Sequence, residues 1–394
     1  MRISLIHKVD YYIGIPLCFL FGMFSNLRRF FSEKNKDIPE NPQNILLIKT
    51  WGLGNIVMMM PLMKKLRETY PAAKIYFLTL KRNQEILEEN PWVDEQLFLD
   101  LSGYAVFLRS IIQILRYLRK KHIDIVLDFD QFARITALLS VFISRIRIGF
   151  DTKGQGIGFI QTFKVPYLND KHMALIFADI VEKIGIKCEG AVPVPIPIKQ
   201  QDITRVKELL NDNNVSAKGP FVIIHVGTGV NIPIRRWDVR RFAELADRLA
   251  EECNVCIFLT GLEDEKVLIR KVLHLMHYPA LELAGRLSVR ELAYLVSLCG
   301  LVVANDTSLV HVASAMNTPV IGLYGPNTPF LYGPRSQRSV AVYKKLECSP
   351  CITNFNAKQT FCKDPVCMKE ITVQEVFDKA KEILEYNDKT DQTC

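Results

Sequence analysis

Short apolar runs alternate with longer segments of helical period from residue 44 onward. In the longer segments, apolar residues recur three or four positions apart, as they do on one face of a helix. We expect strands at 45–49, 74–80 and 123–128 and helices at 56–70, 106–118 and 131–144. Strands that alternate with helices in this way predict βαβ units and a parallel sheet.

A second series of the same kind follows residues 192–198 (VPVPIPI), which are too poor in N–H donors to form a central strand. We expect strands at 221–225, 255–259, 281–283, 301–304 and 320–323 and helices at 241–251, 265–276, 288–298 and 308–315. The pattern therefore predicts an N-terminal domain at 44–190, a proline-rich hinge at 191–200 and a C-terminal domain at 201–394. Two such α/β domains imply a cleft between them, with ligands at the carboxyl ends of the strands.

Residues 1–43 follow a different pattern. The run 11–24 (YYIGIPLCFLFGMF) is continuously apolar, but it is shorter than the roughly 20 residues of a spanning helix and contains Pro16. No small-residue cleavage site follows it, and 33–43 is a polar, proline-broken linker. We expect an in-plane or re-entrant membrane anchor, with Arg28 and Arg29 facing anionic lipid. The alternative is that the run packs against the protein's own surface.

Composition narrows the class of protein. The chain has 394 residues, of which 49% are hydrophobic and 23% charged, so it can build two packed domains. A net charge of +8 without basic blocks interleaved with aromatics favours an anionic small molecule or an anionic membrane surface over nucleic acid. Ten cysteines in so long a chain indicate a reduced, cytoplasmic protein rather than a disulfide scaffold.

Four of the cysteines form one local cluster with the spacing C-x2-C-x10-C-x4-C. They are Cys348, Cys351, Cys362 and Cys367. This spacing is compatible with a tetrahedral structural zinc ion. Free thiols packed in a C-terminal loop, or a disulfide, remain the alternatives.

The loop after the first expected strand runs from Lys49 to Asn55 (KTWGLGN) and opens a helix. Gly52 and Gly54 allow close approach of the backbone to a ligand, and the helix N-terminus behind them favours an anion or a polar acceptor. The motif is neither a dinucleotide fingerprint nor a Walker A loop, and a tight turn without a ligand is nearly as good an interpretation.

Two further strand-to-helix loops lie in the second series. Thr228 follows the first strand of that series, and Arg235 and Arg236 follow shortly after; guanidinium groups near a glycine loop suit a diphosphate, unless they form only a solvated pair. The other loop, NDTSLVH, opens a helix whose free N–H groups would point into the cleft. Its candidate ligand-binding residues are Asp306, Thr307, Ser308 and His311. A lone helical histidine is more often structural.

From residue 44 to about 384, the chain resembles glycosyltransferase family 9, the heptosyltransferase-like enzymes of lipopolysaccharide and related glycan assembly. The matching segments include ILLIKTWGLGNIVMMMPLMKKLRETYPAAKI, NPWVDE, DIVLDFD, RRWDVRRFAELADRL and the block from LAGRLSVREL to LYGPNTP, followed by CSPC. The resemblance implies a GT-B fold with two Rossmann-like domains. It also implies metal-independent, inverting transfer from a nucleotide-sugar donor, which is an ADP-heptose in the best-known members.

The resemblance also implies roles for particular residues. The donor, chiefly its diphosphate, would be held by Thr228, Arg235, Asp306, Thr307, Ser308 and His311. Arg235 or Arg236 would neutralise the charge on the leaving nucleoside diphosphate. No cofactor is implied for catalysis.

One position departs from the family pattern. The first loop of the family usually ends in an aspartate that serves as general base, whereas this chain has Asn55, whose amide cannot take a proton. Asp128 and Asp130, at the end of an expected strand, are candidate replacements. Asp128 could instead cap the next helix, and deprotonation could be late and unassisted. The chain could also be a non-catalytic nucleotide-sugar-binding relative.

The expected anchor suggests where such an enzyme would work. A lipid-linked acceptor, such as a lipopolysaccharide core or an undecaprenyl-linked glycan, would place a peripheral or monotopic enzyme on the cytoplasmic side of the inner membrane.

Overall fold

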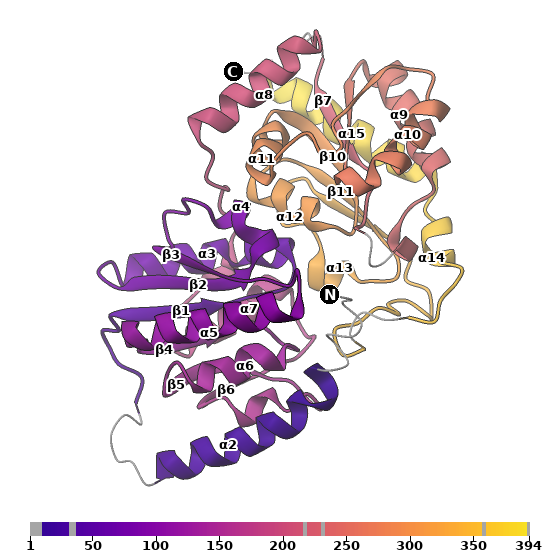
Figure 1. Cartoon of the computed structure of the whole chain (residues 1–394). Coiled ribbons are helices and arrows are strands. Elements are labelled where there is room, and N and C mark those ends of the chain that lie inside the picture. The colour runs from indigo at the N-terminus through magenta and orange to yellow at the C-terminus, as the bar shows by residue number, and fades with distance from the viewer. Residues whose placement is uncertain (1–9, 31–36, 216–218, 230–232, 357–359, 392–394) are drawn as a thin grey trace. The chain divides into compact units, whose positions relative to one another are not determined.

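The computed structural model describes residues 10–30, 37–215, 219–229, 233–356 and 360–391. The chain forms two compact units, Met1–Val192 and Pro193–Cys394 (Figure 1). The division falls inside the proline-rich stretch at 191–200.

Unit 1 is built on a six-stranded parallel sheet with the order β3-β2-β1-β4-β5-β6. Its strands are β1 (Asn44–Ile48), β2 (Lys74–Leu80), β3 (Glu95–Leu99), β4 (Ile125–Asp128), β5 (Ile146–Asp151) and β6 (Phe163–Pro166). The order 3-2-1-4-5-6 is that of a Rossmann sheet. Successive strands are added in one direction up to β3 and in the opposite direction from β4, so the strand order reverses between the parallel strands β1 and β4 and the loops after them meet at one edge.

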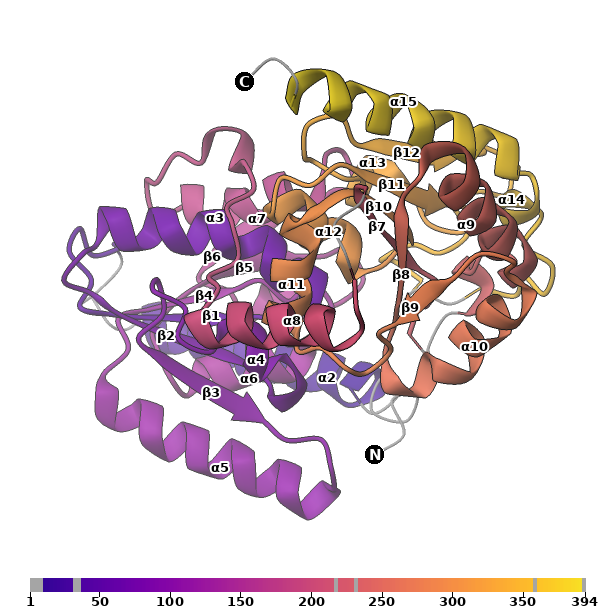
Figure 2. The ribbon, with the colours of Figure 1, turned by 90° about the horizontal axis from the view of Figure 1, so that it is seen from above.

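The helices of unit 1 cover both faces of this sheet (Figure 2). They are α2 (Gly14–Phe30), α3 (Leu53–Thr69), α4 (Gln84–Leu87), α5 (Tyr104–Lys121), α6 (Arg134–Val141) and α7 (Met173–Glu182). Helices α3 and α7 pack together on one face. On the other face, α5 and α6 bury Leu118 and Leu139 against Leu46 and Val126 of the sheet.

Unit 2 repeats the plan with the sheet order β12-β11-β10-β7-β8-β9. Its strands are β7 (Phe221–His225), β8 (Cys256–Thr260), β9 (Ala280–Glu282), β10 (Cys299–Asn305), β11 (Val320–Tyr324) and β12 (Val340–Tyr343). Counted along the unit, this is again the order 3-2-1-4-5-6, with the reversal between β7 and β10.

Three helices cover one face of this second sheet and bury Phe242, Ile269 and Phe377 against it. They are α9 (Val239–Cys253), α10 (Lys266–Leu275) and α15 (Val373–Asp391). The remaining helices are α8 (Gln200–Asp212), α11 (Val289–Ser297), α12 (Ser308–Ala315), α13 (Pro329–Tyr332) and α14 (Val366–Lys369). Helix α11 contacts both α8 and α12.

The α/β class and the two parallel sheets agree with the sequence prediction, but the pattern missed several elements. Four strands were not expected, namely β3, β5, β6 and β12, nor were the helices α7 and α8. The first four residues of strand β3, including the charged Glu95, are only half-buried, and β6 is a short edge strand ending at Pro166. Edge strands of this kind lack the continuous apolar run that marks a buried strand.

Helix α2 packs against unit 1, as the alternative interpretation of the N-terminal run proposed. Gly14, Cys18 and Gly22 lie one turn apart and are buried. Gly14 lies so close to Arg134 that a Cβ there would approach the arginine side chain to 2.7 Å, and Gly22 lies equally close to the backbone of Phe159. Small residues at this spacing let the helix come into close contact with its neighbour.

None of the helices in the described part of the chain is long and apolar enough to cross a membrane. The lipid contact expected of Arg28 and Arg29 lies outside the side chains that the structure describes.

Candidate active site

A buried ion pair joins the two loops at the carboxyl edge of unit 1. The Lys49 ammonium lies 2.9 Å from Oδ1 of Asp130 and also donates to Oε1 of Gln131. The other carboxylate oxygen of Asp130 accepts the backbone N–H of Thr50 at 2.9 Å and the hydroxyl of the same residue. Asp130 is 4% exposed, and both of its oxygens are engaged. It therefore fixes the loop after β1 to the loop after β4.

Asp128 has a different environment. Its Oδ1 accepts the backbone N–H of Asp130 at 3.0 Å, whereas its buried Oδ2 has no hydrogen-bond partner among the described residues. Burial raises the pKa of this carboxyl well above its usual range, and the charge of Asp130 raises it further. Asp128 and Asp130 thus lie together at the carboxyl edge, but neither side chain is exposed.

The loop from Lys49 to Asn55 depends on Gly52. This residue has φ 88°, a conformation that glycine adopts without strain, and it directly precedes helix α3. A Cβ at this position would meet the amide of Asn55 at 2.8 Å. Nδ2 of Asn55 donates to the carbonyl of Trp51 at 3.0 Å, so the amide closes the loop, and Gly54 is buried behind it.

The start of α6 is capped by Asp10, a residue distant in sequence that sequence reasoning missed. Its carboxylate accepts the backbone N–H groups of Arg134 and Ile135 at 3.0–3.1 Å. It also pairs with Nη1 of Arg134 at 3.0 Å. The alternative role of Asp128 as the cap of this helix is not observed. The N-terminal segment is therefore attached to the same edge that carries Asp128.

The first loop of unit 2 is held by Glu265, which the sequence also did not indicate. Oε1 of Glu265 accepts the N–H groups of Thr228 at 2.9 Å and Gly229 at 2.8 Å, and Oε2 accepts the N–H of Leu262. Glu265 is 3% exposed. Gly227 has to be a glycine, because a Cβ there would lie 1.9 Å from this carboxylate. The loop amides therefore bind an internal anion.

Arg235 and Arg236 both fold back over this loop. Nη2 of Arg235 donates to the carbonyl of Thr228 at 3.2 Å, and its Nη1 lies 3.1 Å from Oδ2 of Asp306. Nε of Arg236 donates to the Thr228 hydroxyl at 3.0 Å. The arginines are thus not a freely solvated pair. Arg235 connects the loops after β7 and β10, whereas Arg236 bonds within the loop after β7.

Two asparagine side chains stabilise the loop after β10 by hydrogen bonds. Asn305 donates to the carbonyl of Val226 at 2.9 Å, and Asn327 donates to Oδ2 of Asp306 at 2.8 Å. Asp306 thereby becomes the shared acceptor of Arg235 and Asn327.

Helix α12 begins at Ser308, an exposed residue, after Thr307. Thr307 makes no side-chain capping bond, and its hydroxyl has no partner among the described residues. The first turn of α12 therefore keeps N–H groups that could receive an anion.

His311 is on the same helix but lies deeper. It is 8% exposed, and its ring stacks edge-on against Tyr332, with the centroids 6.5 Å apart. Burial raises the pKa of Tyr332, whose hydroxyl donates to Asn354 at 3.0 Å. His311 is thus packed behind the loop.

The structure does not support a zinc site at the cysteine cluster, which was one of three interpretations of its spacing. Burial raises the pKa of the Cys367 thiol to about 11, with smaller contributions from the nearby Cys351, Cys348 and Cys362. Across the residues with described positions, however, no three His, Cys, Asp or Glu side chains are placed to hold a metal ion. The four cysteines are free thiols, so the disulfide alternative is not observed either.

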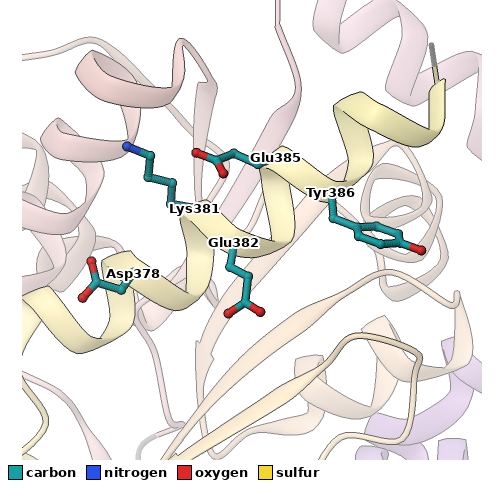
Figure 3. Close-up of a pocket in the computed structure, with 5 residues that line it drawn as sticks. All are labelled: Asp378, Lys381, Glu382, Glu385 and Tyr386. Carbon is teal, nitrogen blue, oxygen red and sulfur yellow. The ribbon is translucent and has the colours of Figure 1, made fainter. Parts of the chain in front are cut away.

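A surface hollow of unit 2 lies away from all of these residues. Figure 3 shows its lining residues, which all come from α15 and carry both signs of charge: Asp378, Lys381, Glu382, Glu385 and Tyr386. It contains none of the residues that the sequence singles out.

The fold defines an α/β protein with two units of Rossmann type. Each unit has a Rossmann strand order and carries its candidate residues where the order reverses. The family model for glycosyltransferase family 9 (heptosyltransferase) matches residues 111–361. The chain therefore belongs to glycosyltransferase family 9.

Characterised relatives agree with this assignment. The chain is 20% identical over 330 residues to the lipopolysaccharide core heptosyltransferase OpsX of Haemophilus influenzae, covering 82% of this chain and 88% of the relative. It is 24% identical over 309 residues to lipopolysaccharide heptosyltransferase 2 of Escherichia coli, covering 75% and 86%. The protein is therefore a glycosyltransferase by family.

Solved structures support the fold. A family 9 glycosyltransferase from Veillonella parvula superposes with a TM-score of 0.75 at 19% identity, covering 89% of this chain and all of that one. The E. coli ADP-heptose lps heptosyltransferase II gives a TM-score of 0.68 at 21% identity, covering 88% and 99%. The two parallel-sheet units are thus those of heptosyltransferases.

Proposed function

We propose that this protein is an inverting, metal-independent glycosyltransferase that moves a heptose from a nucleotide-diphosphate sugar to a lipid-linked glycan such as a lipopolysaccharide core. Family membership supports sugar transfer. The observation that carries the donor assignment is the convergence of Arg235, Arg236 and the start of α12 on one loop edge of unit 2.

In this proposal, unit 2 stabilises the leaving group. The acceptor hydroxyl attacks the anomeric carbon, the bond from that carbon to the diphosphate oxygen breaks, and the configuration inverts. The departing nucleoside diphosphate, which already carries two negative charges in the donor, then gains a third. The guanidinium groups of Arg235 and Arg236 and the free N–H groups of α12 neutralise these charges, which makes a metal ion unnecessary.

Unit 1 would bind the acceptor. Since Nδ2 of Asn55 is engaged with Trp51, its Oδ1 is the atom that can accept a hydrogen bond from the acceptor hydroxyl. Asp130 is engaged by Lys49 and Thr50 and serves as a positioning residue. Asp128 is then the carboxyl to test as proton acceptor against late, unassisted deprotonation.

The second candidate function is a nucleotide-sugar-binding relative without transferase activity. Asn55 favours it, because this residue replaces the carboxylate that the family resemblance leads one to expect. In such a protein the donor residues of unit 2 would still bind ligand.

A transfer assay decides between the two functions. Purified full-length protein is given radiolabelled ADP-, UDP-, GDP- and dTDP-sugars, including ADP-heptose, with bacterial membranes as acceptor. We expect lipid-phase label from one donor, and loss of label in Arg235→Ala but not in Arg240→Ala, an exposed arginine of α9. Donor binding without incorporation, together with transfer restored by Asn55→Asp, would establish the non-catalytic function instead.

We further propose that the enzyme is peripheral on the cytoplasmic side of the inner membrane. A lipid-linked acceptor requires this, because its glycan stays at the bilayer surface. The short apolar N-terminal helix supports the proposal.

A further inference from the structure

The outer face of α2 is a continuous apolar strip. Cys18 and its two glycine neighbours face the protein, and the residues on the opposite side of the helix are exposed. These outward residues of α2 are Pro16, Phe19, Leu20, Met23 and Phe24, and the exposed Tyr12 and Ile13 precede the helix. Phe24 is 63% exposed and Leu20 55%. The helix is thus apolar on both sides, although a helix on the surface of a soluble protein usually presents polar residues to solvent.

The strip extends onto neighbouring parts of unit 1. Phe159 is half exposed and stacks edge-on against Phe19, with the centroids 5.4 Å apart. Phe142, just after α6, does the same with Phe21 at 5.5 Å. Together with the outward residues of α2, these two rings form what we call the α2 surface. A contiguous exposed apolar area of this kind marks an interaction site.

Cations border the α2 surface. The Arg119 guanidinium of α5 lies 5.8 Å from the Phe142 ring, and the Lys164 ammonium lies 5.8 Å from the Phe159 ring. Arg116, three residues before Arg119, and Arg145, three residues after Phe142, are also exposed. The run from Tyr11 to Phe24 contains no acidic residue, and Asp151, 3.9 Å from Lys164, is the acidic side chain beside this border. Aromatic residues ringed by cations complement an anionic lipid surface.

The position of α2 is fixed relative to the carboxyl edge. Its N-terminal end is tied to the first turn of α6 through Asp10 and Arg134, and further along it Phe21 reaches Phe142 beyond the end of α6. The two helices therefore lie side by side with the same chain direction. Burial raises the pKa of the Cys18 thiol, and the charges of Asp10 and, to a smaller extent, Asp128 raise it further. The strip thus begins beside the edge that carries the acceptor loop.

We infer that the α2 surface is a monotopic docking face for an anionic phospholipid bilayer and holds the carboxyl edge of unit 1 at the bilayer surface, where the glycan of a lipid-linked acceptor can reach Asn55. The second part of this inference rests on the proposed function. Because its inner face is buried against α6 and η2 (Ile157–Phe159), α2 stays in the plane of the interface. It is part of the domain rather than a detachable tether.

Vesicle flotation tests the docking face without any sugar substrate. Full-length protein is mixed with phosphatidylcholine vesicles with or without phosphatidylglycerol. We expect flotation that increases with phosphatidylglycerol, and at least about a tenfold loss of partitioning in the triple variant Leu20→Ser, Met23→Ser, Phe24→Ser. The matched control is Val267→Ser with Leu275→Ser, two exposed apolar residues of α10, and it should float as the wild type does.

Two controls keep the test decisive. Hydrogen exchange of residues 134–141 should be the same in the triple variant and the wild type, which shows that unit 1 remains folded. Unchanged flotation of a folded triple variant overturns the inference. So does a wild-type dimer that the triple substitution converts to a monomer without any effect on flotation, because the face would then bind a second copy of this chain.

The link to the acceptor has its own readout. With a membrane-embedded acceptor, the triple variant should lose at least about tenfold in transfer rate, while transfer to a deacylated, water-soluble acceptor should stay unchanged. An equal loss on both acceptors overturns the positioning claim. If no donor supports transfer at all, the proposed function fails, whereas the flotation result still stands.

Discussion

We expect Asp10 to contribute more to the free energy of unfolding than its place near the start of the sequence suggests. It pairs with Arg134, and the side chains of the two are only 14% and 4% exposed. Replacing Asp10 by alanine leaves a buried guanidinium without its carboxylate, which typically costs about 3–5 kcal/mol. Loss of the cap of α6 adds about 1 kcal/mol. The remaining hydrogen-bond partners of Arg134, which include the carbonyls of Phe132 and Gln155 and the side chain of Gln155, compensate in part, so we expect about 3 kcal/mol in total.

The assay is native-state hydrogen exchange of residues 134–141 in the full chain. Since each 1.4 kcal/mol is a factor of ten, exchange in Asp10→Ala should accelerate roughly a hundredfold or more. The matched control is Asp238→Ala, which removes a cap with an arginine partner at the start of α9. That pair is largely exposed, so its loss should cost only about 1 kcal/mol.

A double-mutant cycle isolates the ion pair. Arg134→Ala removes the buried guanidinium with which Asp10 pairs. In the Arg134→Ala background, Asp10→Ala should therefore lower the free energy of unfolding far less than it does in the wild type. The reasoning is refuted if Asp10→Ala changes exchange of α6 by less than about tenfold, or if the two substitutions are additive.

Three further predictions concern the candidate site. Glu265→Ala removes the carboxylate that accepts the N–H groups of Thr228 and Gly229, so it should weaken nucleotide-sugar binding in calorimetry by about tenfold. The control Glu263→Ala changes an exposed neighbour and should leave binding unchanged. Equal effects of the two substitutions would contradict the role of Glu265 in holding this loop. Asn55→Asp loses the donor to the Trp51 carbonyl, so we expect a lower melting temperature, and transfer that rises only if the new carboxylate acts as a base. The pKa of Asp128 is raised in the folded state. The stability that Asp128 contributes is therefore present below its pKa in the unfolded state and is lost as pH rises through its pKa in the folded state. Asp128→Asn should therefore be more stable than wild type in urea unfolding at neutral pH and similar to it near pH 4, and the opposite order would show the carboxylate to be stabilising.

The fold was predictable because its central strands are buried on both faces and therefore read as continuous apolar runs. β1, β4 and β7 follow such runs, and the loops after β1, β7 and β10 carry the motifs that the sequence singled out. What the pattern could not provide were partners distant in sequence. Asp10 and Glu265 look like ordinary surface acids in the sequence, and only the packing places them on backbone N–H groups of other loops.

The cysteine cluster and the N-terminal run show the limits of spacing arguments. Spacing alone cannot tell whether four thiols converge, because the intervening loop decides their directions. In the same way, the apolar run at 11–24 indicated that its residues are buried, but not whether they are buried in a membrane or against the protein. Its glycines, Gly14 and Gly22, were the signal that one side of the helix meets protein, because only a close helix contact needs them.

The carboxylate that binds the amides of Thr228 and Gly229 has a consequence for ligand recognition. An internal counterion already saturates the dipoles of this glycine-rich loop, so the loop is ordered during folding and adds little entropic penalty when a ligand arrives. Attraction of an anionic ligand then falls to the guanidinium charges of Arg235 and Arg236, which dissolved salt screens. Affinity at this edge should accordingly follow ionic strength more than it follows the residues of the loop itself.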